Sequence, residues 1–344
     1  MAAYNIFFGT YSKGPDKGLF RGVFDDDSGE IRFIGTVDIE NPAYLQLNNE
    51  ILYGVSELSE FKGENGGALF SVDISLSQMR LLDIKATHGK HPCHLCIKDN
   101  NIFVSNYSEG SLSIFEIAAA GRIEPSIQSL HHFGKSVRQD RQKASHVHFA
   151  AMMPDGKFLA LCDLGMDEVF LYPYSKASGL STKAKIIDCP PGSGPRHIAF
   201  SSCGKYVFVL MELGNTILSY EYNGTGLSLL QEIPTLPGGF TDSSTAAAIH
   251  LSPDGAYVAA SNRGHDSIAV FKIGNDGRLT FVDHVMTGKN PRDFRFSPCG
   301  KWLLTANQND NSVGIYRMDN GRFNKTGDFP LPKPVCILFG GILS

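Results

Sequence analysis

The stretch SHVHFAAMMPDGKFLALCDLGMDEVFLYPY, from Ser145 to Tyr174, decides the fold. It contains three short apolar segments, HVHFAAM, KFLALC and EVFLYPY, each about as long as a β-strand and rich in Val, Phe, Leu and Tyr. Pro154-Asp155-Gly156 separates the first two segments, and this triplet favours a hairpin because Pro presets the turn and Gly accepts a positive φ. A polar segment, Asp163 to Asp167, separates the last two. Short apolar segments bounded by turn residues predict consecutive antiparallel strands.

The same pattern recurs along the chain, which indicates a repeat. Aligned on Pro42, the copies begin at residues 42, 92, 146, 195, 246, 291 and 334, so their spacing runs from 43 to 54 residues. A period near ~50 residues with four short strands per unit is typical of a β-propeller. Seven starts predict seven blades. The expected fold is therefore all-β, with residues 1–344 forming a single seven-bladed β-propeller domain.

The two ends of the chain predict how the ring closes. The segment KPVCILF from Lys333 supplies only a first strand, whereas the N-terminal NIFFGTYSKG matches NIFVSNYSEG from Asn101 and so begins at a second strand. Residues 5–39 and 334–339 are therefore expected to form one composite blade, which leaves no terminal blade with an open face. The N-terminal segment lacks a basic n-region, so it is interpreted as a strand and not as a signal peptide.

Composition and charge narrow the class of protein. The 344 residues carry a net charge of −4 and no apolar run approaches the ~18 residues of a membrane span, so neither nucleic acid nor membrane is expected as a partner. The seven cysteines are scattered, which predicts buried free thiols in a reducing cytoplasm. Cys93 and Cys96 form a C-x-x-C, but no second pair lies at zinc-ribbon spacing, so ordinary burial is favoured over a metal site and no cofactor is expected. A monomer or weak homodimer is the expected state.

Propeller topology selects candidate site residues. The innermost strand of each blade lines the channel, and the loop entering it opens on the same face as the turn after the second strand. The first group, near the start of the inner strands, comprises His94, His146, His148, Arg196, His197 and Arg292. The second group, after the second strands, comprises Asn106, Asp163, Glu212, Asn215, Asn262, Arg263 and Asn307. Arginines and a glutamate around one cavity suggest an anionic ligand with an acid or base nearby.

Each candidate also has a structural interpretation. The cationic segment KSVRQDRQK, Lys135 to Lys143, is either a solvated loop or a contributor of Arg141 to the pocket, since it leads directly to His146. The two histidines His146 and His148 could be hydrogen-bonded channel residues. Asp163 could stabilise a turn by accepting hydrogen bonds from backbone N–H groups. Glu212 could form a structural ion pair with an arginine instead of acting as a base.

Several motifs in the same order resemble the lactonase family of seven-bladed propellers. They are RQ-x₃-H-x-H from Arg141, D-L-G-x-D from Asp163, G-P-R-H-I-A-F from Gly194, S-N-R-G-x-D-S-I from Ser261 and N-P-R-D-F from Asn290. The family includes bacterial 6-phosphogluconolactonases of the cycloisomerase type and fungal 3-carboxy-cis,cis-muconate lactonising enzymes. The resemblance covers essentially the whole chain.

The resemblance implies hydrolysis of 6-phospho-D-glucono-1,5-lactone, a small anionic sugar lactone, in the oxidative pentose phosphate pathway and without metal or cofactor. It implies His148, Arg196 and Glu212 as catalytic residues, with a further arginine at Arg263 or Arg292. The expected substrate-binding residues are His146, Arg141, Arg263, Arg292, Asp163, Asn262 and His197. His148 and Glu212 are hypothesised to form an acid/base pair. A carboxymuconate cycloisomerase and a non-catalytic binding scaffold remain as alternatives.

Overall fold

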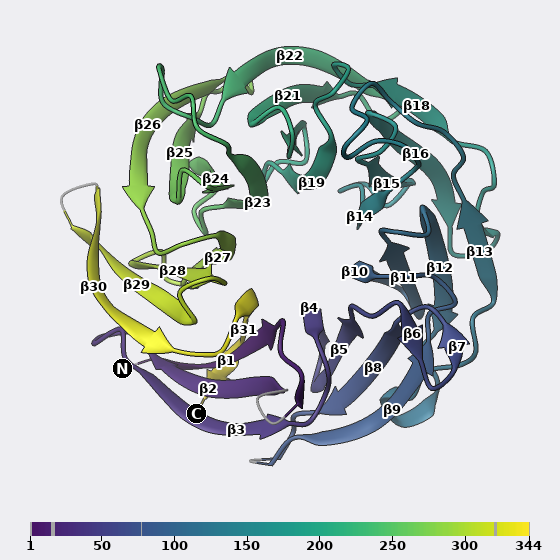
Figure 1. Ribbon diagram of the computed structural model, residues 1–344, viewed down its shortest axis with the longest axis horizontal. Helices are drawn as coiled ribbons and strands as arrows, with labels where there is room; N and C mark the ends of the chain where they lie inside the picture. The colour runs from purple at the N-terminus through teal and green to yellow at the C-terminus, as the bar shows by residue number, and fades with distance from the viewer. Residues whose placement is uncertain (1, 15–17, 77, 320–321, 344) are drawn as a thin grey trace.

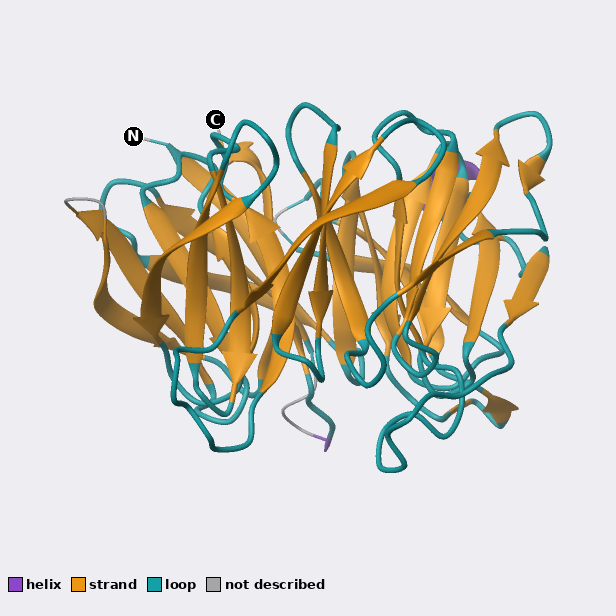
Figure 2. Ribbon diagram, turned by 90° about the horizontal axis from the view of Figure 1, so that it is seen from above, coloured by secondary structure: helices purple, strands orange, loops and turns teal. Residues whose placement is uncertain are grey.

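The computed structural model describes residues 2–14, 18–76, 78–319 and 322–343. Seven antiparallel sheets, each with four main strands, stand around a central channel (Figure 1). In side view the strands run between two faces that are covered by loops (Figure 2). The predicted all-β, seven-bladed propeller is confirmed.

Each blade is given from the channel outward. Blade 1 contains β4 (Pro42–Asn48), β5 (Ile51–Ser56), β8 (Ala68–Asp73) and β9 (Arg80–Ala86), with a small hairpin of β6 (Glu60–Phe61) and β7 (Glu64–Asn65) between β5 and β8. Blade 2 contains β10 (Pro92–Lys98), β11 (Asn101–Asn106), β12 (Ser111–Glu116) and β13 (Gln128–His131), with a 3₁₀ turn at Ala119–Gly121. Blade 3 contains β14 (Val147–Met152), β15 (Phe158–Asp163), β16 (Glu168–Ser175) and β18 (Lys185–Asp188), with the short β17 (Gly179–Leu180) also paired to β16.

The remaining blades follow the same order. Blade 4 contains β19 (Pro195–Phe200), β20 (Tyr206–Met211), β21 (Thr216–Tyr222) and β22 (Leu227–Pro234). Blade 5 contains β23 (Thr245–Leu251), β24 (Tyr257–Arg263), β25 (Ser267–Ile273) and β26 (Leu279–Met286). Blade 6 contains β27 (Pro291–Phe296), β28 (Trp302–Asn307), β29 (Ser312–Asp319) and β30 (Arg322–Pro330). Blade 7 contains β31 (Pro334–Leu343), β1 (Ala3–Thr10), β2 (Leu19–Asp25) and β3 (Ile31–Val37).

Blade 7 joins the two ends of the chain, as the sequence predicts. β31 pairs antiparallel with β1 from Pro334↔Thr10 to Leu343↔Ala3, so the C-terminal strand is the innermost strand of a blade whose other strands are N-terminal. It extends beyond the predicted end at residue 339 because the pairing with β1 continues. In blade 3 the position equivalent to Pro92 is Val147, one residue later than the sequence alignment places it, since Val147 pairs with Asp163 as Pro92 pairs with Asn106.

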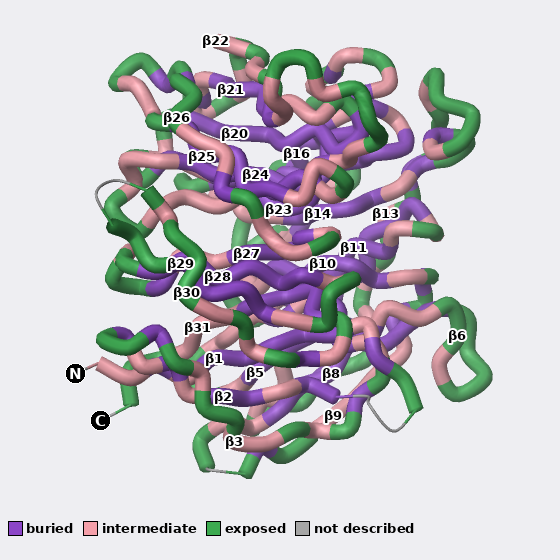
Figure 3. The backbone as a smooth tube through the Cα atoms, turned by 60° about the vertical axis from the view of Figure 1, so that its left-hand side comes forward, coloured by how far each residue is buried: buried purple, intermediate pink, exposed green. Residues whose placement is uncertain are grey.

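The core lies between neighbouring blades. The second strands are apolar on both sides, as in FLALCD of β15 and YVFVLM of β20, where every residue is buried. One cluster packs Leu171 of blade 3 against Val209 of blade 4, and similar clusters follow around the ring. The outer strands face solvent, and none of the residues of β22 or β30 is fully buried (Figure 3). Because both faces of each sheet pack against a neighbour, the ring holds its inner strands rigidly around the channel.

Trp302 seals the contact between blades 6 and 7. Its side chain is 2% exposed, its indole Nε1 donates to the carbonyl oxygen of Asp26 at 2.8 Å, and its ring meets Phe24 edge-on. The composite blade is therefore locked to its neighbour by side-chain packing as well as by strand pairing. None of the described helical turns has the length and apolar character needed to cross a membrane.

Candidate active site

A register shift near the start of every inner strand shapes the channel mouth. At this point one extra residue on the inner strand stands unpaired, as in a β-bulge, which bends the strand and re-aims its side chain. The extra residues are Ala43, Cys93, His148, Arg196, Ala247, Arg292 and Val335. Five of the seven line one small cavity in the channel together with Tyr44, His197 and Asp293. The bulges thus gather side chains from all parts of the sequence at one end of the channel.

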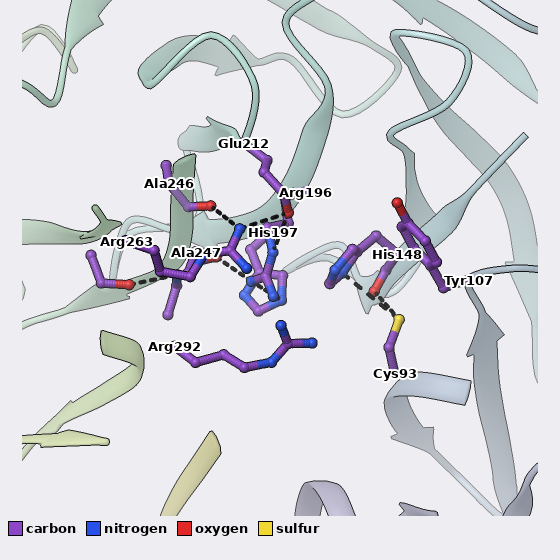
Figure 4. A network of polar contacts seen from close by, with 12 residues as sticks. Cys93, Tyr107, His148, Arg196, His197, Glu212, Ala246, Ala247, Arg263 and Arg292 are labelled. Carbon is purple, nitrogen blue, oxygen red and sulfur yellow. Dashed lines mark hydrogen bonds and ion pairs between the residues drawn. The ribbon is translucent and has the colours of Figure 1, made fainter. Parts of the chain in front are cut away.

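Glu212 lies at the centre of a cluster of arginines. It follows β20 and is 3% exposed. Its Oε1 lies 2.6 Å from Nη2 of Arg141. Its Oε2 lies 2.8 Å from Nε of Arg196 and 3.2 Å from Nη2 of Arg263 (Figure 4). Arg263 also donates to the carbonyl oxygen of Ala246 at 3.0 Å, while its Nε is buried without a hydrogen-bond partner. One carboxylate therefore holds three guanidinium groups.

The charges of this cluster fix its protonation states. Burial by itself raises the pKa of Glu212, but Arg263, Arg196 and Arg141 outweigh burial and hold that pKa well below its usual value. Burial lowers the pKa of Arg196 to about 10, and the nearby Arg263 adds to this effect while Glu212 opposes it. Glu212 is thus ionised and the arginines are charged at neutral pH. A carboxylate so strongly stabilised in its ionised form is a weak base.

His148 faces this cluster from blade 3 as a neutral imidazole. Burial, followed by the charge of Arg196, lowers the pKa of His148 well below its usual value. Its ring meets Tyr107 edge-on at 5.5 Å and His197 at 5.3 Å, and the Cys93 thiol donates to its backbone carbonyl oxygen at 3.3 Å. Figure 4 shows Cys93 and Tyr107 beside it. His148 is therefore neutral at pH 7, and its imidazole has a ring nitrogen with a lone pair that can accept a proton.

Arg292 is the least constrained of the four arginines at the mouth. Its Nη2 lies 3.7 Å from Oε2 of Glu57, its guanidinium lies 4.7 Å from the centre of the Tyr11 ring, and it makes no hydrogen bond to any residue that the structure describes. In Figure 4 it extends toward the middle of the channel, between His197 and Cys93. Its donors are therefore positioned for an anion or a polarised carbonyl oxygen.

The loop that carries Arg141 is fixed to the propeller by Asp167. The Asp167 carboxylate accepts hydrogen bonds from Ser136 Oγ at 2.5 Å and from Gln142 Nε2 at 2.8 Å, on either side of Arg141. It also accepts from the backbone N–H groups of Gly192 and Gly194, both at 2.6 Å, just before β19 and Arg196. One buried carboxylate thus sets the positions of two loops that deliver arginines to Glu212.

Comparison with known proteins agrees with this architecture. The sequence model described as "Lactonase, 7-bladed beta-propeller" matches residues 5–339. The chain belongs to this lactonase family. A 6-phosphogluconolactonase of Bacillus subtilis strain 168 is 33% identical over 351 residues, which cover 98% of this chain and 99% of that protein. The predicted family, and with it the class of lactone-hydrolysing enzymes, is confirmed.

Two solved structures are also similar to this chain over nearly their whole length. A proposed 6-phosphogluconolactonase from Bacteroides fragilis superposes with a TM-score of 0.92 at 31% identity, covering 98% of both chains. A periplasmic gluconolactonase from Pseudomonas aeruginosa gives 0.92 at 30% identity, covering 98% of this chain and 99% of that one. The proteins similar to this chain thus include ones named for phosphorylated and for unphosphorylated lactones.

Most of the predicted site residues meet at this mouth. His148, Arg196 and Glu212, predicted as catalytic, lie together with Arg141 and Arg263 as described, and Arg292 faces them across the channel. His197 accepts a hydrogen bond from Arg196 Nη1 at 3.0 Å, and burial lowers its pKa well below the usual value, so it is neutral. His146 stacks on Tyr107 at 4.4 Å and donates through Nδ1 to the carbonyl oxygen of Tyr107 at 3.0 Å.

Asp163 and Asn262 lie at the same end of the propeller but within the blades. Asp163 is fully buried and accepts hydrogen bonds from Ser145 Oγ at 2.5 Å and from the backbone N–H of His146 at 2.8 Å, and it pairs with His132 at 2.8 Å. Asn262 is fully buried and exchanges hydrogen bonds with both the side chain and the carbonyl oxygen of Thr235. The structure therefore gives both side chains partners within the fold.

Sequence reasoning missed four residues of the mouth, namely Tyr11, Glu57, Tyr107 and Cys93. The first three each directly follow the last residue of a second strand, as Glu212 follows Met211. Four predicted residues lie one position before the one that Glu212 occupies in its blade, and all are buried: Asn106, Asp163, Asn262 and Asn307. Tyr107 and Glu57 would have been found by aligning every blade on Glu212. Cys93 and Cys96 are buried free thiols, and no described group of three His, Cys, Asp or Glu residues is placed to hold a metal ion.

Proposed function

We propose that the protein hydrolyses 6-phospho-D-glucono-1,5-lactone to 6-phosphogluconate. The observation that supports this most directly is a buried, neutral His148 opposite a Glu212-centred group of arginines, with Arg292 free to bind. The similarity to proteins named 6-phosphogluconolactonase and gluconolactonase supports the lactone as substrate. The oxidative pentose phosphate pathway and a cytoplasmic location follow from this proposal as predictions.

His148 acts as the general base in the proposed mechanism. Its neutral imidazole takes a proton from a water molecule while the water oxygen attacks the lactone carbonyl carbon. The bond from that carbon to the ring oxygen then breaks, and the ring oxygen receives the proton from the imidazolium. Cys93 Sγ lies 3.8 Å from Nδ1 of His148 and Tyr107 meets the ring edge-on, which leaves Nε2 as the nitrogen that accepts the proton.

The arginines stabilise the negative charge that develops during the attack. Arg196 and Arg292 line the channel cavity, where their guanidinium groups can donate to the carbonyl oxygen as it becomes an oxyanion. Glu212 acts on the arginines: guanidinium groups engage both of its carboxylate oxygens, and these contacts hold Arg141, Arg196 and Arg263 in place. The sequence leaves the base role open between His148 and Glu212, and we propose the histidine because its imidazole has no such ion pairs with the described residues.

The test is a pH-stat assay on freshly generated 6-phosphogluconolactone, with glucono-1,5-lactone as the second substrate and the rate of spontaneous hydrolysis subtracted. Catalysed hydrolysis of the phosphorylated lactone is the expected result. If the purified protein hydrolyses neither lactone above the spontaneous rate, the proposal is wrong. Adding a carboxymuconate to the same series of assays tests the alternative cycloisomerase activity. The names of the similar proteins favour a lactone as substrate.

A further inference from the structure

A second cavity opens beside the channel on the same face of the ring. It has a volume of about 460 Å³ and lies where blades 6, 7 and 1 meet. We call it the rim cavity, and its lining includes Tyr11, Lys13, Asn41, Glu57, Asn311 and Lys333. Blade 4, which carries Arg196 and precedes Glu212, lies on the opposite side of the ring, as the positions of β19 and β31 show (Figure 1).

The rim cavity shares a wall with the channel cavity. Tyr11 and Glu57 line the rim cavity, and the Tyr11 hydroxyl donates a hydrogen bond to Glu57 Oε2. Arg292 lines the channel cavity and packs against this same pair, 4.7 Å from the Tyr11 ring centre and 3.7 Å from the Glu57 carboxylate. A substrate whose reacting end lies at His148 and Arg196 would therefore direct its other end past Arg292 toward the rim cavity.

Lys333 is an unusual residue for its backbone conformation. It precedes an inner strand and has a φ of +39°, in the left-handed region. The equivalent residues before β4, β10, β19 and β27 are Asn41, His91, Gly194 and Asn290, which are residue types that adopt this region most readily. Lys333 is held there because its N–H donates to Asn311 Oδ1 at 3.1 Å and its carbonyl oxygen accepts from Tyr11 N at 2.9 Å. Backbone strain of this kind is concentrated at ligand-binding sites.

The charges at the shared wall fit a dianion. Among the described residues that line the rim cavity, Lys13 and Lys333 are cationic and Glu57 is anionic. Arg292 lies behind Glu57 at 3.7 Å and offsets its charge, so the two lysines leave a formal excess of two positive charges. A phosphate ester carries about −1.5 to −2 charges near neutral pH and has three acceptor oxygens. We propose that the rim cavity binds the phosphate group of the substrate, with Lys333 as its main cationic contact. This inference rests on the proposed function, and it identifies the substrate class as a phosphorylated sugar lactone.

The test compares two lactones that differ only in the phosphate. Lys333→Asn removes the charge and replaces lysine by a residue that suits the left-handed backbone, so the variant is expected to fold. The ratio of kcat/KM for 6-phosphogluconolactone to kcat/KM for glucono-1,5-lactone should fall about tenfold, mainly through KM for the phosphorylated lactone. Lys90→Ala, which removes an exposed lysine outside both cavities, should keep the wild-type ratio. A wild-type ratio in Lys333→Asn would overturn the proposal.

A binding measurement separates this inference from the proposed function. Calorimetry with 6-phosphogluconate, gluconate and inorganic phosphate needs no turnover, so it remains decisive even if neither lactone is hydrolysed. The wild-type protein should bind 6-phosphogluconate more tightly than gluconate, and Lys333→Asn should lose most of this preference. Equal affinity for the two acids in the wild-type protein contradicts the subsite. So does an affinity for inorganic phosphate that matches that for 6-phosphogluconate, since the cavity would then bind the free ion alone.

Discussion

Oε1 of Glu212 lies 2.6 Å from Nη2 of Arg141, although Arg141 belongs to the loop before β14 and Glu212 follows β20, 71 positions later. The same arginine nitrogen donates to the Tyr107 hydroxyl at 3.3 Å. A side chain from a loop between blades 2 and 3 is thus drawn across the mouth to blade 4. The contact ties the loop over the channel to the residues within it.

Replacing Glu212 by Gln should reduce both stability and activity. The change leaves Arg141, Arg196 and Arg263 close together without their carboxylate, and breaking a buried ion pair by removing one partner costs about 3–5 kcal/mol. Thermal unfolding and the lactonase assay measure the two effects. The matched control is Glu221→Gln on β21, because the exposed Glu221–Lys205 pair at 3.1 Å should be worth less than ~1 kcal/mol. Equal losses of stability in the two variants would contradict the central role of Glu212.

Replacing His148 by Gln should lower kcat by about 10²–10⁴-fold, the usual contribution of a general base. Because burial lowers the pKa of His148, wild-type kcat/KM should persist below the pH at which an ordinary histidine becomes protonated and fall only at more acidic pH. The fall of kcat/KM at acidic pH should remain in the Glu212→Gln variant and be absent from the His148→Gln variant. His131→Gln, an exposed histidine of β13, serves as the control. Wild-type turnover in His148→Gln would assign the base elsewhere.

The blade pattern was predictable from the sequence because each strand is short, apolar and closed by turn residues, and because KPVCILF has no second strand of its own. The face of the propeller on which the site lies also followed from topology. Which residue points into the mouth did not. Asn106 and Tyr107 are neighbours, yet only Tyr107 reaches Arg141, while Asn106 donates to Ser111 and Ser113 inside its blade.

The sequence did not predict which residue points into the mouth because this depends on the register of each strand to within one residue. Side chains alternate between the two faces of a strand, so a shift of one position exchanges the mouth for the blade interior. The bulges that orient the side chains of Cys93, His148 and Arg292 depend on pairing between strands. No residue type in these strands predicts them. The family motifs identified His148, Arg196 and Glu212 as candidates without this information. Tyr11 and Glu57 carry no such motif; aligning the blades on Glu212 brings them to the mouth, and their contacts with Arg292 appear only in the structure.

Folding stability should fall as the pH is lowered from neutrality toward 5.5. Burial lowers the pKa of four histidines, that of His250 to about 4 and those of His94, His148 and His197 well below 6.5, so the unfolded chain binds protons near pH 6.5 that the folded protein does not. Stability therefore rises with pH in this window. Four such groups amount to roughly 5 kcal/mol between about pH 7.5 and 5.5. Urea denaturation at the two pH values measures this, and His94→Gln should reduce the difference by about a quarter; a pH-independent midpoint contradicts the four neutral histidines.

Removing the ten residues from 335 onward should abolish cooperative folding. The deletion takes away the inner strand of blade 7 and with it the fully buried Cys336 and Ile337, and it exposes the paired edge of β1. Phe339 is lost as well, although its ring packs edge-on against Phe24 at 5.4 Å. Deleting only residues 342–344 is the control, because Ile342 is 66% exposed and Leu343 is 36% exposed. Circular dichroism during thermal unfolding compares the variants. If the ten-residue deletion melts at the wild-type temperature, closure by the C-terminal strand does not stabilise the ring.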